Sequence, residues 1–368
     1  MIAWVAGGVV VAIWLYLALA HGGFWRTSIG RPAVAAEPVT WPSVVAVVPA
    51  RDEAAVLPET LPTLVGQRYP GSFRVVVVDD DSHDGTGELA AALGAEVVRG
   101  AGPPPGWAGK VAAQAAGIAA AGAPDYLLLT DADIAFPPDA VRELVRAAVG
   151  QRLILTSLMV RLRVVTEWER WLVPAFVYFF AQLYPFARVN RGRTRAAAGG
   201  CMLVARTELQ AVGGLASIRD AVIDDVALAR RLGARGPIWL GLGDDLRSVR
   251  PYPRLADLWR MVARSAYTQL RHSPALLTGT VLGLLVVYVL PVGLVVAAPF
   301  APGPAVLGAA GWLLMTTTYL PMLRWYGVGW WRAPLLPGVA LLYTAMTLDS
   351  ARRHYAGRGA EWKGRVGP

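Results

Sequence analysis

A stretch of 51 residues without a single Lys, Arg, Asp or Glu, from position 273 to 323, constrains this chain most strongly. Residues 1–20 carry no charged side chain either. Because about 20 apolar residues cross a bilayer as a helix, the long run holds two spans and the N-terminal run holds one. Three prolines and a glycine at 299–304 predict the turn between the two spans. A further uncharged run of 16 residues, 333–348, contains two prolines, and whether it spans is left open.

The N-terminal run is predicted to be a membrane anchor and not a cleaved signal peptide. Residues 18–20 (Ala-Leu-Ala) resemble a cleavage site, but no positive charge precedes the run. The first basic residues, Arg26 and Arg31, follow it. By the positive-inside rule, the residues after this span face the cytoplasm.

The net charge of +9 and the pI near 10.0 could indicate a nucleic-acid partner. Much of the basic charge, however, flanks apolar segments, at 188–195, 250–271 and 352–365, where anionic lipid headgroups attract it. We therefore expect the lipid bilayer as a partner and no nucleic acid. The single cysteine, Cys201, excludes an intramolecular disulfide, and the four histidines show no zinc-ligand spacing.

Between the first apolar run and the later ones, strand and helix patterns alternate along the chain. The patterns predict strands at 44–48, 74–78, 96–98 and 126–130, and helices at about 54–67, 85–93 and 109–121. Near-continuous apolar strands separated by helices indicate an α/β fold, with a mostly parallel sheet covered on both faces. In such sheets ligands bind beyond the carboxyl ends of the strands.

Carboxylates and turn residues gather at three of these strand ends. The first strand ends in Pro-Ala-Arg-Asp-Glu at 49–53, the second leads into an acidic segment at 79–86, and the fourth is followed by Asp131 and Asp133. Repelling acids in one crevice are costly unless a cation or a hydrogen-bond donor compensates them. Mg²⁺ and Mn²⁺ prefer oxygen ligands and bridge carboxylates to phosphates, so the pair predicts a metal-assisted site for a nucleotide diphosphate. The alternative is solvated turns, with Asp84 as a helix cap.

Five short motifs follow one another in order between residues 44 and 232. They are Pro-x-Arg-x-Glu, Val-Asp-Asp-x-Ser-x-Asp-Gly-Thr, Gly-Lys, Asp-Ala-Asp and Asp-Asp-Val-Ala-Leu. This ordered set resembles the family 2 glycosyltransferases with a GT-A fold. Segments at 105–110, 168–170, 176–186, 198–204 and 259–264 are most similar to the bacterial hopene-associated glycosyltransferases, which are related to ceramide and carotenoid glycosyltransferases.

The resemblance implies an inverting transfer of a sugar from a nucleotide-diphosphate sugar to a membrane lipid, such as a hopanoid or a similar lipid alcohol. The implied location is the bacterial inner membrane, with several spans and a cytoplasmic catalytic domain. A polyprenyl-phosphate, ceramide or carotenoid sugar transferase is the alternative within this class. By the same resemblance, Asp80 contacts the base, and the nucleotide-sugar site consists of Pro49, Arg51, Glu53, Asp80, Lys110, Asp131 and Arg264.

The resemblance also assigns the metal and the base. Asp133 is the principal ligand of a divalent metal, Mg²⁺ or Mn²⁺, and Asp131 lies near the ribose and the metal. The acidic pair Asp224-Asp225 stands where the family usually has Glu-Asp, which makes Asp225 the base that takes the proton of the acceptor hydroxyl. The alternative makes Asp224 and Asp225 the N-cap and first turn of a helix.

One departure from the family pattern argues against a polymer synthase. Processive members carry Gln-x-x-Arg-Trp near the membrane, whereas residues 261–265 keep only Arg264. We therefore expect a non-processive enzyme. Arg264 either neutralises the diphosphate or meets lipid headgroups.

Two further segments are predicted to lie at the membrane surface. Apolar and basic residues form separate stripes at helical spacing within 251–272, which indicates an amphipathic interfacial helix. Residues 171–187 are uncharged and rich in aromatic side chains. If they crossed the bilayer, Asp225 and the Asp131 motif would lie on opposite sides, so we expect an interfacial segment or part of an acceptor channel; a buried core helix is the alternative.

We therefore expect five parts along the chain. They are an anchor at 1–22, a cytoplasmic GT-A catalytic domain at 40–250, an interfacial helix at 251–272, a membrane region with two or three spans at 273–349, and a basic tail at 350–368. Two other function classes stay open. A nucleotidyltransferase shares this sheet type, but the glycine-rich loop expected after its first strand is absent here. A catalytically silent membrane scaffold can keep the same fold.

Overall fold

The chain forms two compact units, each built from separate stretches of sequence. The computed structural model describes residues 1–33, 36–357, 361–362 and 365–366. The sheet unit comprises residues 28–163, 188–251 and 360–368, and the helical unit comprises residues 1–27, 164–187 and 252–359. The catalytic domain expected at 40–250 is therefore interrupted, because residues 164–187 belong to the helical unit. The expected basic tail lies partly outside the described residues.

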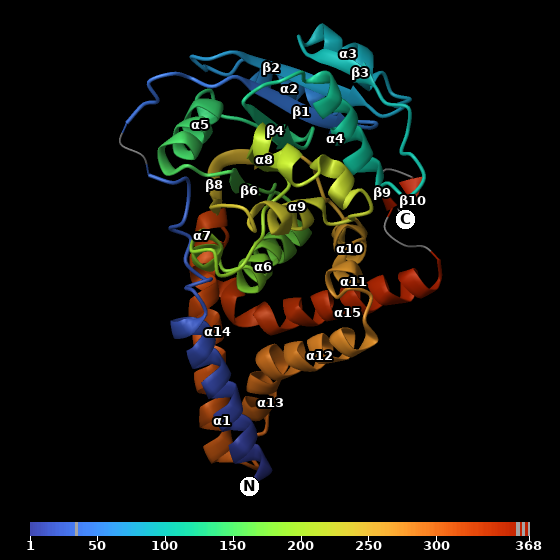
Figure 1. Cartoon of the computed structure of the whole chain (residues 1–368). Helices are drawn as coiled ribbons and strands as arrows, with labels where there is room; N and C mark the ends of the chain where they lie inside the picture. The colour runs from blue at the N-terminus through green and yellow to red at the C-terminus, as the bar shows by residue number, and fades with distance from the viewer. Residues whose placement is uncertain (34–35, 358–360, 363–364, 367–368) are drawn as a thin grey trace. The chain divides into compact units, whose positions relative to one another are not determined.

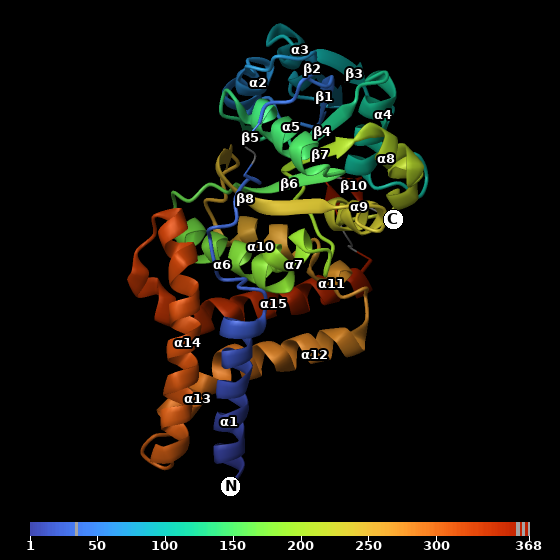
Figure 2. The ribbon, with the colours of Figure 1, turned by 60° about the vertical axis from the view of Figure 1, so that its left-hand side comes forward.

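An eight-stranded mixed sheet forms the centre of the sheet unit (Figures 1 and 2). Its strands in spatial order are β3 (Glu96–Arg99), β2 (Phe73–Asp79), β1 (Val44–Ala50), β4 (Tyr126–Thr130), β7 (Cys201–Ala205), β6 (Leu155–Arg161), β8 (Ile238–Ser248) and β5 (Ile134–Ala135). The four strands predicted from the sequence lie together and pair in parallel. Strand β7 runs antiparallel to both β4 and β6, so the second half of the sheet departs from a simple parallel arrangement.

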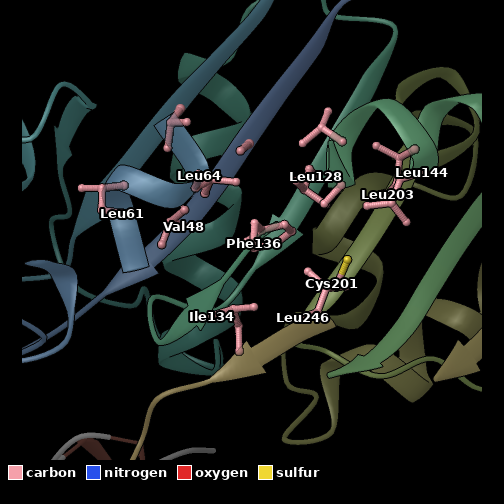
Figure 3. Packing of buried hydrophobic residues seen from close by; sticks show 14 of the residues in the cluster. Val48, Leu61, Leu64, Leu128, Ile134, Phe136, Leu144, Cys201, Leu203 and Leu246 are labelled. Carbon is pink, nitrogen blue, oxygen red and sulfur yellow. The ribbon is translucent and has the colours of Figure 1, made fainter. Parts of the chain in front are cut away.

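Helices cover both faces of this sheet because the strands are apolar on both sides. The helices are α2 (Leu57–Val65), α3 (Thr86–Ala92), α4 (Gly109–Ala120), α5 (Ala140–Gln151), α8 (Arg206–Ala211) and α9 (Asp224–Leu232). Leu61 and Leu64 of α2 and Leu144 of α5 pack with Val48 and Leu128 in one core cluster (Figure 3). Alternate residues of β1 face the other way, towards α4, as the two-residue period of a strand requires.

The helical unit contains the long apolar helices. In chain order they are α1 (Ile2–Leu15), η1 (Tyr16–Ala20), α6 (Glu167–Leu183), the start of α7 (Phe186–Asn190), α10 (Leu255–Ala263), α11 (Ala266–Gln269), α12 (Pro274–Leu284), η3 (Leu285–Val289), α13 (Leu290–Val296), α14 (Pro302–Tyr326), η4 (Trp330–Leu335) and α15 (Leu336–Tyr355). The described residues near the C-terminus form a short pair of strands, β9 (Glu361–Trp362) and β10 (Arg365–Val366), which is assigned to the sheet unit. The predicted interfacial helix at 251–272 is not one helix: it breaks at Arg264-Ser265 into α10 and α11.

Four helical segments are long and apolar enough to cross a membrane, among the residues that the structure describes. They are Ile2–Ala20, Glu167–Asn190, Pro274–Val296 and Pro302–Tyr326. Three of them coincide with the predicted spans, and the fourth contains the aromatic segment 171–187. Helix α15, which contains most of the undecided run 333–348, does not meet these criteria.

Small residues let α1 and α14 lie side by side, as both ribbon views show (Figures 1 and 2). A Cβ placed on Gly311 would lie 2.4 Å from Val10, and one on Gly303 would lie 2.3 Å from Trp4. Close backbone approach at small residues is the usual way for apolar helices to pack in lipid. Trp14 of α1 also donates an indole hydrogen bond to the Val287 carbonyl in η3, at 2.8 Å.

A glycine in α4 gives a direct test of the helix packing on the sheet. A Cβ on Gly117 would lie 2.5 Å from Val47 of β1 and 2.8 Å from Val78 of β2. In an open helix Gly→Ala stabilises by up to about 1 kcal/mol. We expect Gly117→Ala to destabilise instead, by about 1–3 kcal/mol, because the added methyl group overpacks the core. The measurement is thermal unfolding of the detergent-solubilised protein. Ala119→Val, on the exposed side of α4, is the control and should change the melting temperature little; an unchanged or raised melting temperature for Gly117→Ala would contradict this packing.

Candidate active site

The loops that follow β1 and β2 are tied to each other by hydrogen bonds. Arg51 donates to the backbone carbonyls of Asp80 and Asp81, at 2.5 and 3.0 Å. Asp52 has a left-handed backbone with φ of 51°, accepts from the His83 N–H at 2.9 Å, and donates from its own N–H to Ser82. Asp80 is buried at this junction. The structure therefore brings the first two strand ends together, as the sequence predicted.

The start of α3 is fixed by a neighbouring set of contacts. Thr86 accepts a hydrogen bond from the Glu53 N–H at 2.8 Å, and its own N–H donates to Asp84 at 3.1 Å. Asp84 also accepts from the Ala54 N–H. The cap position before α3 is held by Gly85, with φ of 81°, and not by Asp84 itself. The acidic segment 79–86 therefore helps to hold the start of α3 in place, in addition to lying at the strand ends.

Lys110, in the first turn of α4, lies among three carboxylates. Its Nζ is 2.8 Å from Asp131 and 3.3 Å from Asp224, and Asp225 lies close by. Burial alone would lower the pKa of Lys110, but these carboxylates hold the pKa above its ordinary value. The lysine is therefore charged at neutral pH and compensates part of the acidic charge that follows β4 and begins α9.

Asp225 is held in place by backbone donors. Its Oδ2 accepts from the Gly199 N–H at 2.8 Å, and its Oδ1 accepts from the Val226 N–H at 2.7 Å. Burial, followed by the repulsion of Asp224, raises its pKa to about 7, although Lys110 and the two N–H groups act in the opposite direction. A Cβ on Gly199 would lie only 3.3 Å from both Asp225 and Lys110. Glycine at position 199 therefore allows the close approach that this arrangement requires.

The helix-cap alternative for Asp224 and Asp225 is wrong in one respect. Helix α9 begins at Asp224, with Ile223 at the cap position. Asp224 therefore lies in the first turn and does not cap the helix. Its carboxylate contacts Lys110, and acidic residues in a first turn also suit the helix dipole.

Asp133 lies in a second, more buried group. Ser248, at the end of β8, donates to its Oδ2. Arg250 Nη2 lies 3.2 Å from Asp133 Oδ1 and 2.7 Å from Glu53 Oε1. The predicted metal ligands Asp131 and Asp133 therefore have different partners: the first pairs with Lys110, the second with Ser248 and Arg250.

The donor set fits a divalent ion only in a limited way. Among the described residues, no cluster of three or more His, Cys, Asp or Glu side chains could hold a metal. Mg²⁺ commonly takes one or two carboxylates and completes its shell with phosphate oxygens and water. Asp133, with or without Asp131, provides that minimum. The chemistry of these oxygens suits an ion that arrives with a diphosphate.

Two of the predicted site residues stand apart from these groups. Pro49 is buried near the end of β1 and pairs with Val78 of β2, so it belongs to the sheet and not to the loop that follows. Arg264 is exposed, directly follows α10 and belongs to the helical unit, so its role at the diphosphate stays a prediction. The remaining predicted residues all belong to the sheet unit, in the three groups described above.

Three residues that contact the predicted ones were not assigned to the site from the sequence. Gly199 was noted only as part of the segment 198–204, although two adjacent glycines before a strand indicate close backbone approach. Ser248 and Arg250 carry no such signal, because their positions depend on the pairing of β5 with β8.

Comparisons with known proteins found one matching family model and several similar folds. Residues 45–209 match the family model Glycosyl transferase family 2. A solved mannosyltransferase from Pyrobaculum calidifontis, in complex with GDP-Man and Mn²⁺, has a TM-score of 0.55 and 21% sequence identity, covering 92% of this chain and 99% of that one. A mannosyl-3-phosphoglycerate synthase from Rubrobacter xylanophilus has 23% identity and a TM-score of 0.40, covering 62% of this chain and 74% of that one. A search of curated protein sequences found no match.

Residues 45–209 thus match a glycosyltransferase family 2 domain, and the fold is GT-A. The protein is a glycosyltransferase. The expected fold class and enzyme class are confirmed.

Removing the central lysine tests the electrostatics of the site. We expect Lys110→Met to destabilise the protein by about 3 kcal/mol at neutral pH, because it leaves partly buried carboxylates without their cation. Repulsion raises a carboxyl pKa in the folded state, so the folded protein binds more protons than the unfolded one, and stability falls as the pH rises through that pKa. The loss of melting temperature should therefore be larger at pH 8 than at pH 5.5.

Arg99→Met is the matched control for this experiment. Arg99 forms an exposed ion pair with Glu88 at 3.3 Å, and such pairs contribute little to stability. Its melting temperature should stay near that of the wild type at both pH values. A Lys110→Met loss that is small, or equal at both pH values, would contradict the charge compensation described here.

Proposed function

We propose that this protein is a membrane-bound, non-processive glycosyltransferase. It moves a sugar from a nucleotide-diphosphate sugar to a lipid hydroxyl, with inversion at the anomeric carbon. The observation that carries the proposal is the position of Asp225. This carboxyl is held by two backbone N–H groups, lies beside the lysine that pairs with Asp131, and has a pKa raised to about 7.

The donor binds, in this proposal, along the carboxyl ends of β1, β2 and β4. Arg51 holds the loop that carries Asp80, so Asp80 can receive the base. The mannosyltransferase of similar fold is in complex with GDP-Man and Mn²⁺, which supports a nucleotide-sugar donor and a divalent ion. Asp133, with Asp131, would hold the ion, which when bound helps neutralise the charge that develops on the leaving diphosphate.

Asp225 acts as the general base. As the acceptor oxygen attacks the anomeric carbon, the carboxylate takes the hydroxyl proton, and the bond between the sugar and the diphosphate breaks. A base works best when its pKa lies near the working pH, because it is then deprotonated and still a good proton acceptor. A solvated aspartate has a pKa near 3.9 and would be a weaker base.

Lys110 acts mainly as a positioning residue. Its contacts to Asp131 and Asp224 connect the acidic segment after β4 with the start of α9, which carries the base. This arrangement holds the donor side and the acceptor side of the reaction in one geometry. The second carboxylate, Asp224, raises the pKa of Asp225 without needing to contact the substrate.

The acceptor is proposed to be a lipid because the helical unit suits a bilayer. Among the described residues, the three apolar segments that coincide with the predicted spans are long enough to cross, and a water-soluble acceptor would need none of them. Extracting a lipid into water would expose its apolar surface, at a free-energy cost of about 25 cal/mol per Å². The resemblance seen in the sequence favours a hopanoid or a similar lipid alcohol, with polyprenyl phosphate, ceramide and carotenoid acceptors as alternatives. The catalytic region would face the cytoplasm of a bacterial inner membrane.

A product assay tests this function directly. The full-length protein would be reconstituted into liposomes with hopanoid alcohols, polyprenyl phosphate or ceramide, and given a panel of UDP- and GDP-sugars with Mg²⁺ or Mn²⁺. We expect a glycolipid by mass spectrometry, and far less of it with Asp225→Asn in the same reaction time. Transfer to soluble acceptors alone would overturn the lipid assignment, and a lack of transfer with every pair would favour the silent scaffold.

The role of Asp225 gives a second prediction. Asp225→Asn should lower the rate of transfer by about 10²–10⁴-fold, the usual contribution of a general base, while the dissociation constant for the nucleotide sugar changes little. Because Asp225 must be deprotonated to act, the wild-type rate should rise about tenfold between pH 6 and pH 8. The measurements are initial rates across this pH range and equilibrium binding of the donor.

Asp220→Asn is the control for this pair, because Asp220 is an exposed acid a few residues before α9. It should keep the wild-type rate and pH profile. Wild-type transfer by Asp225→Asn, or a rate that falls as the pH rises through 7, would show that Asp225 is not the base.

A further inference from the structure

Arg250 joins two carboxylates that come from different strand ends. Its Nη2 lies 2.7 Å from Glu53, which follows β1, and 3.2 Å from Asp133, which follows β4. The side chains of Glu53 and Asp133 are only 8% and 9% exposed, whereas that of Arg250 is 27% exposed. The Arg250 side chain is therefore more solvent-accessible than either acid, and its guanidinium contacts both of them.

The pairing of β5 with β8 places Arg250 beside Asp133. Ile134 pairs with Ser248 in the sheet, and the Val249 N–H donates to the Asp133 carbonyl at 2.9 Å. The Ser248 hydroxyl holds the other carboxylate oxygen of Asp133. Since backbone register fixes these neighbours, Arg250 stays near Asp133 whether or not its side chain touches it.

The place taken by the guanidinium is one that suits a cation. Arg250 places a positive charge between two buried carboxylates, whose mutual repulsion is unfavourable. A divalent ion on Asp133 would provide that charge instead. Arg250 occupies Oδ1 of Asp133 and Ser248 occupies Oδ2, so an ion on this carboxylate would have to displace or share one of these contacts.

We propose that Arg250 is a positioning residue that competes with the divalent ion for Asp133. This inference rests on the proposed function, which assigns Asp133 to the metal. Before the donor and the ion arrive, Arg250 neutralises Asp133 and Glu53. When the ion binds, the longer contact to Asp133 is released, and the shorter contact to Glu53 keeps the guanidinium beside the diphosphate. The ion thereby replaces the arginine at Asp133, and this carboxylate has a positive charge beside it before and after the exchange.

The test is binding of Mn²⁺ alone to the full-length protein in detergent, followed by the electron paramagnetic resonance signal of free Mn²⁺. We expect Arg250→Gln to bind Mn²⁺ about fivefold more tightly than the wild type, because one competing ion pair is removed. Arg247→Gln is the matched control: Arg247 is an exposed arginine of β8, and its loss changes the net charge equally. This variant should bind Mn²⁺ as the wild type does.

Arg250→Lys covers the case in which the glutamine variant does not fold, which a thermal melt would reveal. Lysine keeps the charge but lacks the second nitrogen group of the guanidinium, so we expect Mn²⁺ affinity between those of the wild type and Arg250→Gln. Equal or weaker Mn²⁺ binding by both Arg250 variants, relative to Arg247→Gln, overturns the competition.

The outcome for Arg250 is separable from the outcome for the proposed function. If no variant binds Mn²⁺ while the wild type still transfers sugar, the competition is overturned and the transferase assignment stands. If the expected Mn²⁺ shift is found but no donor and acceptor pair gives a product, the competition stands and the proposed reaction is overturned.

Discussion

The ion pairs of Lys110 are the constraint on which the rest of the candidate site depends. They bring the acidic segment after β4 and the first turn of α9 together, although these segments are more than 90 residues apart in the chain. Without a cation between them, the like charges of these two segments would repel each other. Because the group is largely buried, removing the lysine would leave the acids without their cation and would lower the stability of the fold. Burial and the neighbouring Asp224 raise the pKa of Asp225 towards the pH at which a general base works well, although Lys110 acts in the opposite direction.

The second group of charges, around Arg250, follows the same principle with a different purpose. Lys110 is mostly buried and pairs with acids proposed to serve the reaction, whereas Arg250 is more exposed and contacts an acid proposed to bind an ion. In the proposed reaction, Lys110 maintains the geometry of the site, and Arg250 compensates charge only until the donor and its ion supply it.

The sequence predicted the first half of the sheet well and the second half poorly. Strands β1, β2, β3 and β4 are apolar runs between clear helices, so their order and parallel pairing follow from local pattern and connection rules. Strand β7 and the β5–β8 pair depend on contacts between distant segments, which no local pattern shows. For the same reason Asp131 and Asp225 could be recognised from motifs, whereas Ser248 and Arg250 could not. The break at Arg264-Ser265 was missed because the apolar stripe continues across it.

The stereochemistry of transfer tests the central claim most directly. A single base that activates the acceptor for direct displacement must invert the configuration at the anomeric carbon. The anomeric coupling constant of the glycolipid formed from an α-linked nucleotide sugar can be measured by proton nuclear magnetic resonance. We expect a β-linked product at every time point of the reaction. An α-linked initial product would contradict direct displacement with Asp225 as the base.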